Sequence, residues 1–261
     1  MKHQLSTENY SDQPLITAIV ACYSGDQHLL PRALSSVVEQ FPGEDILEII
    51  VVFDGTPNDE VAEVCKNFGV DVLLGTGEPT GYYTQPRNLA TLVARGHYIA
   101  NLDADNEWAP GHLKGLLTAI RTPHPFDGLP VFTYSRRRYI SDEGAQEGLP
   151  TGDSPFQPWD DSAYPRLVQG PMNNFVDSSD FLIGKAALFR LAENTGCIWE
   201  PSRVRFGDWE LVLRMASLGF RGRAVNQVTN LYHWTGKNLQ ITRRDDVQLT
   251  AVPRALLEKI A

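Results

Sequence analysis

The sequence has no apolar run approaching the roughly 20 residues that a membrane-spanning helix requires. Its first 13 residues are polar and lack the apolar centre of a secretory signal peptide. Cysteine is also scarce: there are only three, Cys22, Cys65 and Cys197, odd in number and spaced unlike any paired metal site. We therefore expect a cytoplasmic protein with no membrane span, whose thiols stay reduced in or near the core.

Positive charge is sparse in most of the chain. Residues 1–200 contain 13 Lys and Arg against 27 Asp and Glu, whereas residues 201–261 contain 10 against 5. The net charge of −9 argues against stable nucleic-acid binding, which draws much of its affinity from neutralised phosphates. The basic C-terminal part either faces phosphates or is a solvated surface.

Short apolar runs rich in β-branched residues alternate with segments of helical spacing. The runs are residues 15–22, 46–53, 70–74 and 97–102. Four such strand–helix repeats predict an α/β fold with a mostly parallel sheet flanked by helices. Ligands of parallel sheets bind at the carboxyl ends of the strands, which is where Tyr23, Asp54 and Asp103 fall.

The second half of the chain has a different character. Residues 141–175 are rich in Gly, Pro, Asp, Ser and aromatic residues with little periodicity. This composition indicates a long loop or lid that faces the substrate, with a disordered insertion as the alternative. A helix is predicted over residues 208–218 and a late strand over residues 224–232. Apolar spacing within residues 241–261 favours a terminal helix.

Two carboxylates, Asp103 and Asp105, lie two residues apart at the end of a predicted buried strand. At a turn of this kind they can converge on one hard divalent cation, Mn²⁺ or Mg²⁺. Such a cation can bridge the phosphates of a nucleotide diphosphate and stabilise a leaving group. A solvated turn with its own capping bonds is the alternative, but the buried strand in front of the pair favours the metal site.

Three further residues are candidates for binding a nucleotide or a metal. Asp54 can accept hydrogen bonds from a nucleobase or ribose, or belong to an ordinary Asp-Gly turn. Arg87 begins a predicted helix and suits an anion site, although a surface arginine would show the same pattern. His233 follows the late strand, and either completes the metal shell or is a hydrogen-bonded histidine in an aromatic cluster.

The second half of the chain contains further candidate functional residues, for which the sequence evidence is weaker. Asp208 begins a helix, so it is either an N-cap or a general base that deprotonates an acceptor hydroxyl. The aromatic loop from Thr151 to Phe175 and the arginines from Arg136 to Arg138 are candidate acceptor contacts, with a solvated strand end as the alternative for the arginines. Further basic residues can neutralise a diphosphate or lie on the surface, namely Arg221, Arg223, Lys237, Arg243 and Arg244.

Several motifs over roughly residues 14–235 resemble, in order and spacing, the inverting glycosyltransferases of family 2, which have the GT-A fold. The motifs are Ala21-Cys22-Tyr23-Ser24, Val51-Val52-Phe53-Asp54-Gly55-Thr56, Pro86-Arg87-Asn88, Ala100-Asn101-Leu102-Asp103-Ala104-Asp105 and Gly207-Asp208-Trp209-Glu210-Leu211. Three positions depart from the family's pattern. Ser24 stands where an Asn is frequent, Phe53 replaces the first acid of a pair, and Gly207 replaces an acid that often precedes the residue at Asp208.

The resemblance implies one GT-A domain over residues 14–261 after a polar tail of residues 1–13. Its nucleotide-sugar half would be residues 14–125 and its acceptor half residues 126–240, followed by a C-terminal tail or helix over residues 241–261. The implied reaction moves a sugar from a nucleotide-diphosphate donor to an acceptor hydroxyl with inversion. The acceptor stays open between a growing glycan, a lipid-linked sugar, a protein side chain and a modified nucleobase, and a homo-oligomer is compatible with the sequence.

The resemblance also implies roles for single residues. Asp208 would be the catalytic base. The donor would be bound by Tyr23, Asp54, Arg87, Asp103 and Asp105, and the metal by Asp103, Asp105 and His233. Two other functions are considered. A nucleotidyltransferase would require a glycine-rich basic loop after the first strand, which residues 23–28 do not form, and a non-catalytic nucleotide-sugar-binding module would not need all three acids.

Overall fold

The computed structural model of the chain describes residues 15–41, 47–123, 130–143, 147–159, 175–202 and 206–235. The predicted polar tail over residues 1–13 and the C-terminal tail or helix over residues 241–261 lie outside these ranges. The same holds for residues 160–174 of the aromatic loop, and for Lys237, Arg243 and Arg244.

The first half of the described chain forms a parallel sheet. Its strands are β1 (Ile16–Tyr23), β2 (Leu47–Asp54), β3 (Val72–Gly75) and β4 (Tyr98–Asp103), in the spatial order β3-β2-β1-β4. All three pairings among them are parallel, as the strand–helix repeats predict. Strands β1, β2 and β4 are buried on both faces, which explains why their sequences are nearly continuous apolar runs.

The second half extends the same sheet with strands of both directions. These are β5 (Glu107–Trp108), β6 (Phe132–Ser141), β7 (Gly152–Asp153), β8 (Phe181–Gly184) and β9 (Gly222–Trp234). The order continues from β4 through β8, β6 and β9 to β5, and β7 pairs with β6. Strand β8 is antiparallel to both neighbours, whereas β6 and β9 are parallel. The sheet is thus parallel over β1, β2, β3 and β4 and mixed over the remaining strands.

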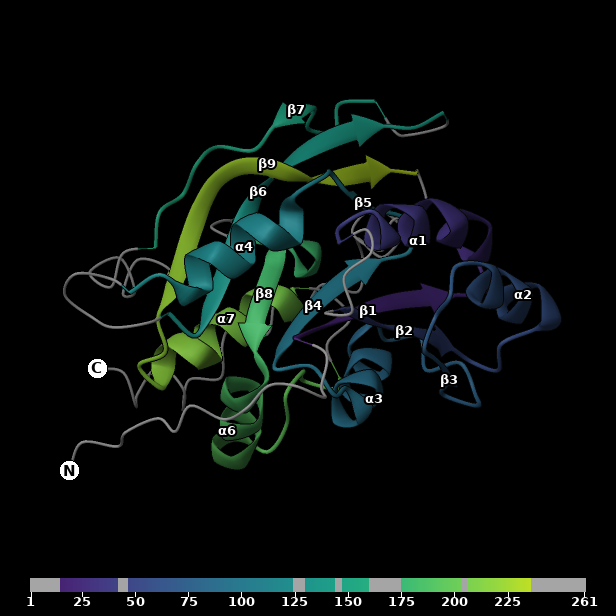
Figure 1. Cartoon of the computed structure of the whole chain (residues 1–261), viewed down its shortest axis with the longest axis horizontal. Coiled ribbons are helices and arrows are strands. Elements are labelled where there is room, and N and C mark those ends of the chain that lie inside the picture. The colour runs from purple at the N-terminus through teal and green to yellow at the C-terminus, as the bar shows by residue number, and fades with distance from the viewer. Residues whose placement is uncertain are drawn as a thin grey trace.

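Helices cover both faces of the sheet (Figure 1). One apolar cluster joins the sheet to α1 (Leu30–Val38), α2 (Asp59–Asn67) and α4 (His112–Arg121). The other joins the opposite face to α3 (Thr84–Val93), α6 (Lys185–Thr195) and α7 (Gly207–Ser217). Two short 3₁₀ helices are η1 (Gln27–Leu29) and η4 (Ser178–Asp180). The arrangement is a three-layer α/β/α domain.

Local chemistry accounts for the start of α2. The side chain of Asn58 accepts a hydrogen bond from the backbone N–H of Val61 at 2.9 Å, and Asp59 and Glu60 occupy the first turn. These groups satisfy an end N–H and complement the positive end of the helix.

Within the described ranges, no helix combines the length and the apolar character that crossing a bilayer would demand.

Candidate active site

The ends of β1, β2 and β4 meet at one edge of the sheet. Tyr23 is aligned with Asp54 across the β1–β2 pair, and Ala21 is aligned with Asp103 across the β1–β4 pair. This register confirms that Tyr23, Asp54 and Asp103 share the carboxyl edge, where parallel sheets bind ligands. Tyr23 is 39% exposed and so presents part of its ring to solvent there.

Asp103 is held by groups of the protein itself. Its Oδ1 accepts a hydrogen bond from the guanidinium of Arg87, and its Oδ2 accepts one from Ser178 Oγ at 3.3 Å. Arg87 is fully buried and lies over the rings of Tyr83 at 4.7 Å and Trp199 at 5.3 Å. Arg87 is therefore an internal anchor of the Asp103 carboxylate, and its predicted contact with the donor stays a prediction.

Asp105 lies among negative charges. Burial raises the pKa of Asp105 well above its ordinary value, and the charges of Asp103, Asp26 and Asp177 raise it further, while Arg32 acts in the opposite direction. Arg32 also donates to the backbone carbonyl of Asp105 at 2.6 Å, which fixes the turn after β4. A concentration of carboxylates of this kind favours binding of a cation.

The donor atoms at this edge suit a hard divalent cation. No cluster of three or more His, Cys, Asp or Glu side chains within the described ranges is placed to hold a metal ion. Mg²⁺ and similar ions are commonly bound through one or two carboxylates, with substrate phosphates and waters completing the shell. Asp105 and the nearby Asp103, whose charge acts on it, fit that second type of site, in which the protein supplies only part of the shell.

Asp54 organises the loop between β3 and α3. Its Oδ1 accepts hydrogen bonds from the backbone N–H of Thr80 at 2.8 Å and from Thr76 Oγ1 at 3.2 Å, and its Oδ2 accepts one from the N–H of Gly81 at 2.9 Å. The loop is thereby fixed beside the ends of β1 and β2. The contact of Asp54 with a nucleoside stays a prediction, and it would share these carboxylate oxygens.

Asp208 lies in the first turn of α7 and is 7% exposed. Burial raises its pKa from the ordinary 3.8 to about 7, the charge of Asp177 raises it as well, and the Trp209 N–H together with Arg137 and Arg87 opposes the rise. Its Oδ1 accepts the N–H of Trp209 at 2.7 Å. A carboxylate with a pKa near neutrality is suited to accept a proton from a hydroxyl.

His233 is held between two carboxylates. Its Nδ1 lies 2.7 Å from Asp142 Oδ1 and its Nε2 lies 2.8 Å from Glu107 Oε1. The ring centroids of the neighbouring Tyr232 and Trp234 lie 4.8 Å apart. This matches the alternative in which His233 is a hydrogen-bonded histidine in an aromatic cluster. Its role as a metal ligand stays a prediction, and it would require one ring nitrogen to leave its carboxylate.

Residues 177–180 belong to the site but were not selected from the sequence. Ser178 contacts both Asp103 and Arg87, and Ser179 Oγ accepts the N–H of Asp103 at 3.3 Å. The charge of Asp177 raises the pKa of Asp103, Asp105 and Asp208 alike. The available signal is the Asp-Ser-Ser-Asp pattern before an apolar run, which the structure shows to be a capping box.

The three consecutive arginines of β6 have separate environments. Arg137 is buried and forms an ion pair with Asp180 at 2.6 Å, and Asp180 also accepts from Asn230 at 2.7 Å. Arg138 is exposed and pairs with Asp153 at 2.6 Å. Arg136 donates to the carbonyl of Ser154 at 2.8 Å. Solvation of a strand end therefore describes Arg138 but is wrong for Arg137, because the side chain of Arg137 is buried against Asp180.

Replacing Arg137 by methionine is expected to lower the free energy of unfolding by about 3–5 kcal/mol, because Asp180 would be left buried without its counter-charge. The matched control is Arg138→Met on the same strand, which removes only an exposed pair and is expected to leave the unfolding midpoint unchanged. Urea unfolding at pH 7 measures both. Equal midpoints for the two variants would contradict the assignment.

Arg223 has a structural role at the C-terminal end of α4. Its guanidinium donates to the carbonyls of Ala119 at 2.8 Å and Thr122 at 2.6 Å, at the C-terminal end of α4. It thus satisfies carbonyl groups that the end of a helix leaves open.

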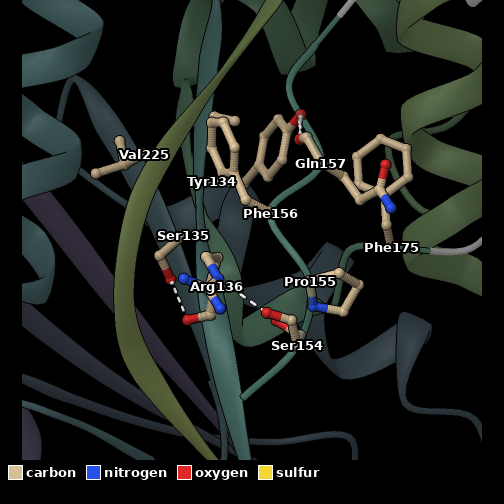
Figure 2. A pocket seen from close by; sticks show the side chains of 10 residues that line it. Tyr134, Ser135, Arg136, Ser154, Pro155, Phe156, Gln157, Phe175 and Val225 are labelled. Atoms are coloured by element: carbon tan, nitrogen blue, oxygen red, sulfur yellow. Dashed lines mark hydrogen bonds between the residues drawn. The ribbon is translucent and has the colours of Figure 1, made fainter.

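A small pocket lies between β6, β9 and the segment of residues 147–159 (Figure 2). Tyr134 lies on one wall and donates its hydroxyl to the carbonyl of Gln157 at 2.8 Å, while Phe156 is 40% exposed. The ring centroid of Phe175 lies 5.6 Å from that of Tyr134 and 5.3 Å from that of Trp209, the neighbour of Asp208. The described part of the aromatic loop is packed on the sheet, and it leads toward α7.

The sequence matches a known protein family. The profile described as Glycosyl transferase family 2 matches residues 17–189, about two thirds of the chain. The chain belongs to glycosyl transferase family 2. Among curated relatives, an uncharacterized glycosyltransferase of Methanocaldococcus jannaschii, MJ1057, is 28% identical over 106 residues, which are 40% of this chain and 36% of that protein. An uncharacterized protein of Sinorhizobium fredii, y4gI, is 32% identical over 115 residues, or 43% and 12% of the two chains.

Solved structures show the same fold. S. aureus TarS 1-349 has a TM-score of 0.63 and 15% identity, covering 84% of this chain and 60% of that one. The mannosyltransferase PcManGT of Pyrobaculum calidifontis, in complex with GDP-Man and Mn²⁺, has a TM-score of 0.57 and 17% identity, covering 85% and 57%. The family 2 chain is therefore a GT-A domain, as the sequence resemblance implies. It spans about a third or less of the two curated relatives.

Proposed function

We propose that this family 2 chain is a glycosyltransferase that moves a sugar from a nucleotide-diphosphate donor to an acceptor hydroxyl with inversion. One observation carries the proposal: Asp103 and Asp105 lie at the carboxyl end of β4, and the same domain has a buried Asp208 whose pKa is about 7. TarS has been solved with UDP-GlcNAc and PcManGT with GDP-Man and Mn²⁺, which supports a nucleotide-sugar donor here.

The donor would bind at the edge formed by β1, β2 and β4. Asp54 and Tyr23 lie beside each other there and would contact the nucleoside. Asp103 and Asp105 would hold a divalent cation, which when bound supplies positive charge to the departing diphosphate. Arg87 would fix the orientation of Asp103, because it reaches that carboxylate from a buried position between two aromatic rings. His233 would join this shell only if one of its ring nitrogens left the carboxylate that it now contacts.

Asp208 would take the proton from the acceptor hydroxyl as its oxygen attacks the anomeric carbon. The bond from that carbon to the diphosphate breaks as the new glycosidic bond forms, and the proton passes to Asp208 Oδ. Attack from the face opposite the leaving group inverts the anomeric centre. Phe175 contacts Tyr134 of β6 and Trp209, the neighbour of Asp208, so the acceptor would approach along this aromatic segment.

Adding a matching nucleotide sugar together with Mn²⁺ is expected to raise the melting temperature of the protein. A ligand present at 100 times its dissociation constant stabilises the native state by about 2.7 kcal/mol. A thermal-shift series with UDP-GlcNAc, UDP-glucose and GDP-mannose, each with Mn²⁺, with Mg²⁺ or with EDTA, measures this effect. Mannose 1-phosphate with Mn²⁺ is the control without a nucleotide. Absence of any stabilisation that depends on both nucleotide and metal would contradict the donor assignment.

A further inference from the structure

We propose that Tyr83 is a positioning residue whose hydroxyl holds the first residues of α7 so that Asp208 faces the donor site. This inference rests on the proposed function, because it assigns Tyr83 a task in the same transfer reaction.

The chain enters α7 through a strained residue. Phe206 has φ 57°, and within the described ranges it is the only residue other than glycine with a positive φ. This left-handed conformation is unfavourable for a bulky side chain and persists only where the surroundings enforce it. Asp208 follows two positions later, so its direction depends on how this entry is held.

A phenylalanine at the N-cap position has no side-chain oxygen that could accept an N–H of the first turn. The backbone N–H of Gly207 donates a hydrogen bond to the hydroxyl of Tyr83, which lies 124 residues earlier in the sequence. The first N–H groups of a helix have no partner within the helix and are usually satisfied by a local cap. The hydroxyl of Tyr83 thus accepts a hydrogen bond from a helix N–H that a local capping side chain would ordinarily accept.

Tyr83 also explains why residue 207 is a glycine. A Cβ atom at Gly207 would lie 2.6 Å from Tyr83 Oη and 3.0 Å from Thr84 Cγ2. Any larger side chain would displace the tyrosine hydroxyl. The acid that the resemblance leads one to expect at this position is therefore excluded by Tyr83, and the backbone N–H of Gly207 takes up the contact.

The ring of Tyr83 reaches the donor side of the site. It lies 4.7 Å below the guanidinium of Arg87, which in turn binds Asp103. Through its hydroxyl the same residue binds the start of α7. Tyr83 therefore contacts both the helix that carries the base and the arginine that orients the metal-site carboxylate, and it sets the separation of these two groups.

Tyr83→Phe removes the hydroxyl but keeps the ring under Arg87. With water as acceptor, the rate of nucleoside diphosphate release from UDP-GlcNAc or GDP-mannose, whichever the wild type binds, is expected to fall about tenfold in kcat, since small misplacements of a catalytic group are costly. The dissociation constant of the donor is expected to stay within about twofold, because the contacts at Asp103 are unchanged. The matched control is Tyr98→Phe at the opposite end of β4, which should keep the wild-type kcat. An unchanged kcat in Tyr83→Phe, or a loss confined to donor affinity, would overturn the proposal.

A double-mutant cycle separates positioning from general stability. Gly207→Ala in the wild type is expected to lower kcat at least as much as Tyr83→Phe, because the new Cβ meets the hydroxyl. In the Tyr83→Phe background the same alanine should cost several-fold less, since the atom it would meet is gone. Additive effects on kcat would refute the contact. If the wild type neither binds nor hydrolyses any donor, the proposed function fails, and the same cycle read in urea unfolding still tests the contact between Tyr83 and Gly207.

Discussion

Asp208→Asn is expected to lower kcat for sugar transfer by about 10²–10⁴-fold, the range that a positioned general base contributes. Asparagine preserves the shape of the side chain and can still accept the Trp209 N–H, so α7 should keep its place. The dissociation constant of the donor should be nearly unchanged, because the role proposed for Asp208 is to act on the acceptor. Nucleoside diphosphate release with a sugar acceptor, or with water in its place, measures kcat, and calorimetry measures donor binding.

The pH dependence provides a second test of Asp208. A general base works as the carboxylate, and burial raises the pKa of Asp208 to about 7, so wild-type kcat should fall about tenfold per pH unit below that value. The residual rate of Asp208→Asn should lack this dependence. Asp59→Asn, at an exposed carboxylate in the first turn of α2, should keep both the rate and the profile of the wild type. A variant at Asp208 that retains the wild-type kcat would refute its role as base.

The same pKa shift affects stability in a definite direction. Because the folded-state pKa of Asp208 is raised above its unfolded value, the folded protein binds this proton more tightly than the unfolded chain. The resulting stabilisation is complete below about pH 4 and is lost as the pH rises through about 7. Asp208→Asn should therefore melt at a higher temperature than the wild type at pH 8, with a smaller difference at pH 5. Melting curves at the two pH values measure this.

Asp105→Asn is expected to abolish the metal-dependent part of donor binding and to lower kcat/KM by about 10²-fold or more, because the leaving diphosphate loses its charge stabilisation. Without metal and donor, the variant should be more stable than the wild type, since the charges of Asp103, Asp26 and Asp177 disfavour ionised Asp105. Loss of function with a gain in stability is the expected signature of a carboxylate kept for binding.

Thermal shifts with Mn²⁺, with the nucleotide sugar, and with both together measure this prediction. The wild type should respond most strongly to the combination, and Asp105→Asn should respond to the combination no more than to its parts. Asp59→Asn is again the matched control. If Asp105→Asn kept the full metal-dependent shift, the cation would have to be bound elsewhere.

The sequence predicts the parallel half of the fold well. Each of β1, β2, β3 and β4 is an apolar run with its own following helix, so local pattern and tertiary place agree. The sequence predicts the mixed part of the sheet, strands β5 to β9, less well. Strand β6 carries three consecutive arginines, and the one that is buried, Arg137, is acceptable in the interior only because Asp180 lies 2.6 Å away. That partner belongs to a turn 43 residues later, which no local pattern reveals.

The site shows the same division. Asp103, Asp105 and Asp208 can be selected from the sequence, because each stands at the end of a predicted strand or the start of a predicted helix within a motif that resembles the family. Ser178 and Tyr83 could not be selected, because their importance lies in what they contact. One holds Asp103, and the other holds Gly207 across a sequence separation of 124 residues.

By itself the sequence determined the alternation of strands and helices in the parallel part, the edge at which Tyr23, Asp54 and Asp103 meet, and the family, since these follow from local periodicity and from short motifs. Only the tertiary structure decided that Arg87 faces Asp103 and not solvent, that His233 lies between two carboxylates, and that the hydroxyl of Tyr83 accepts the N–H of Gly207 at the start of α7. The physical reason is that the energy of a buried polar group depends on its partners, and here those partners come from distant parts of the chain.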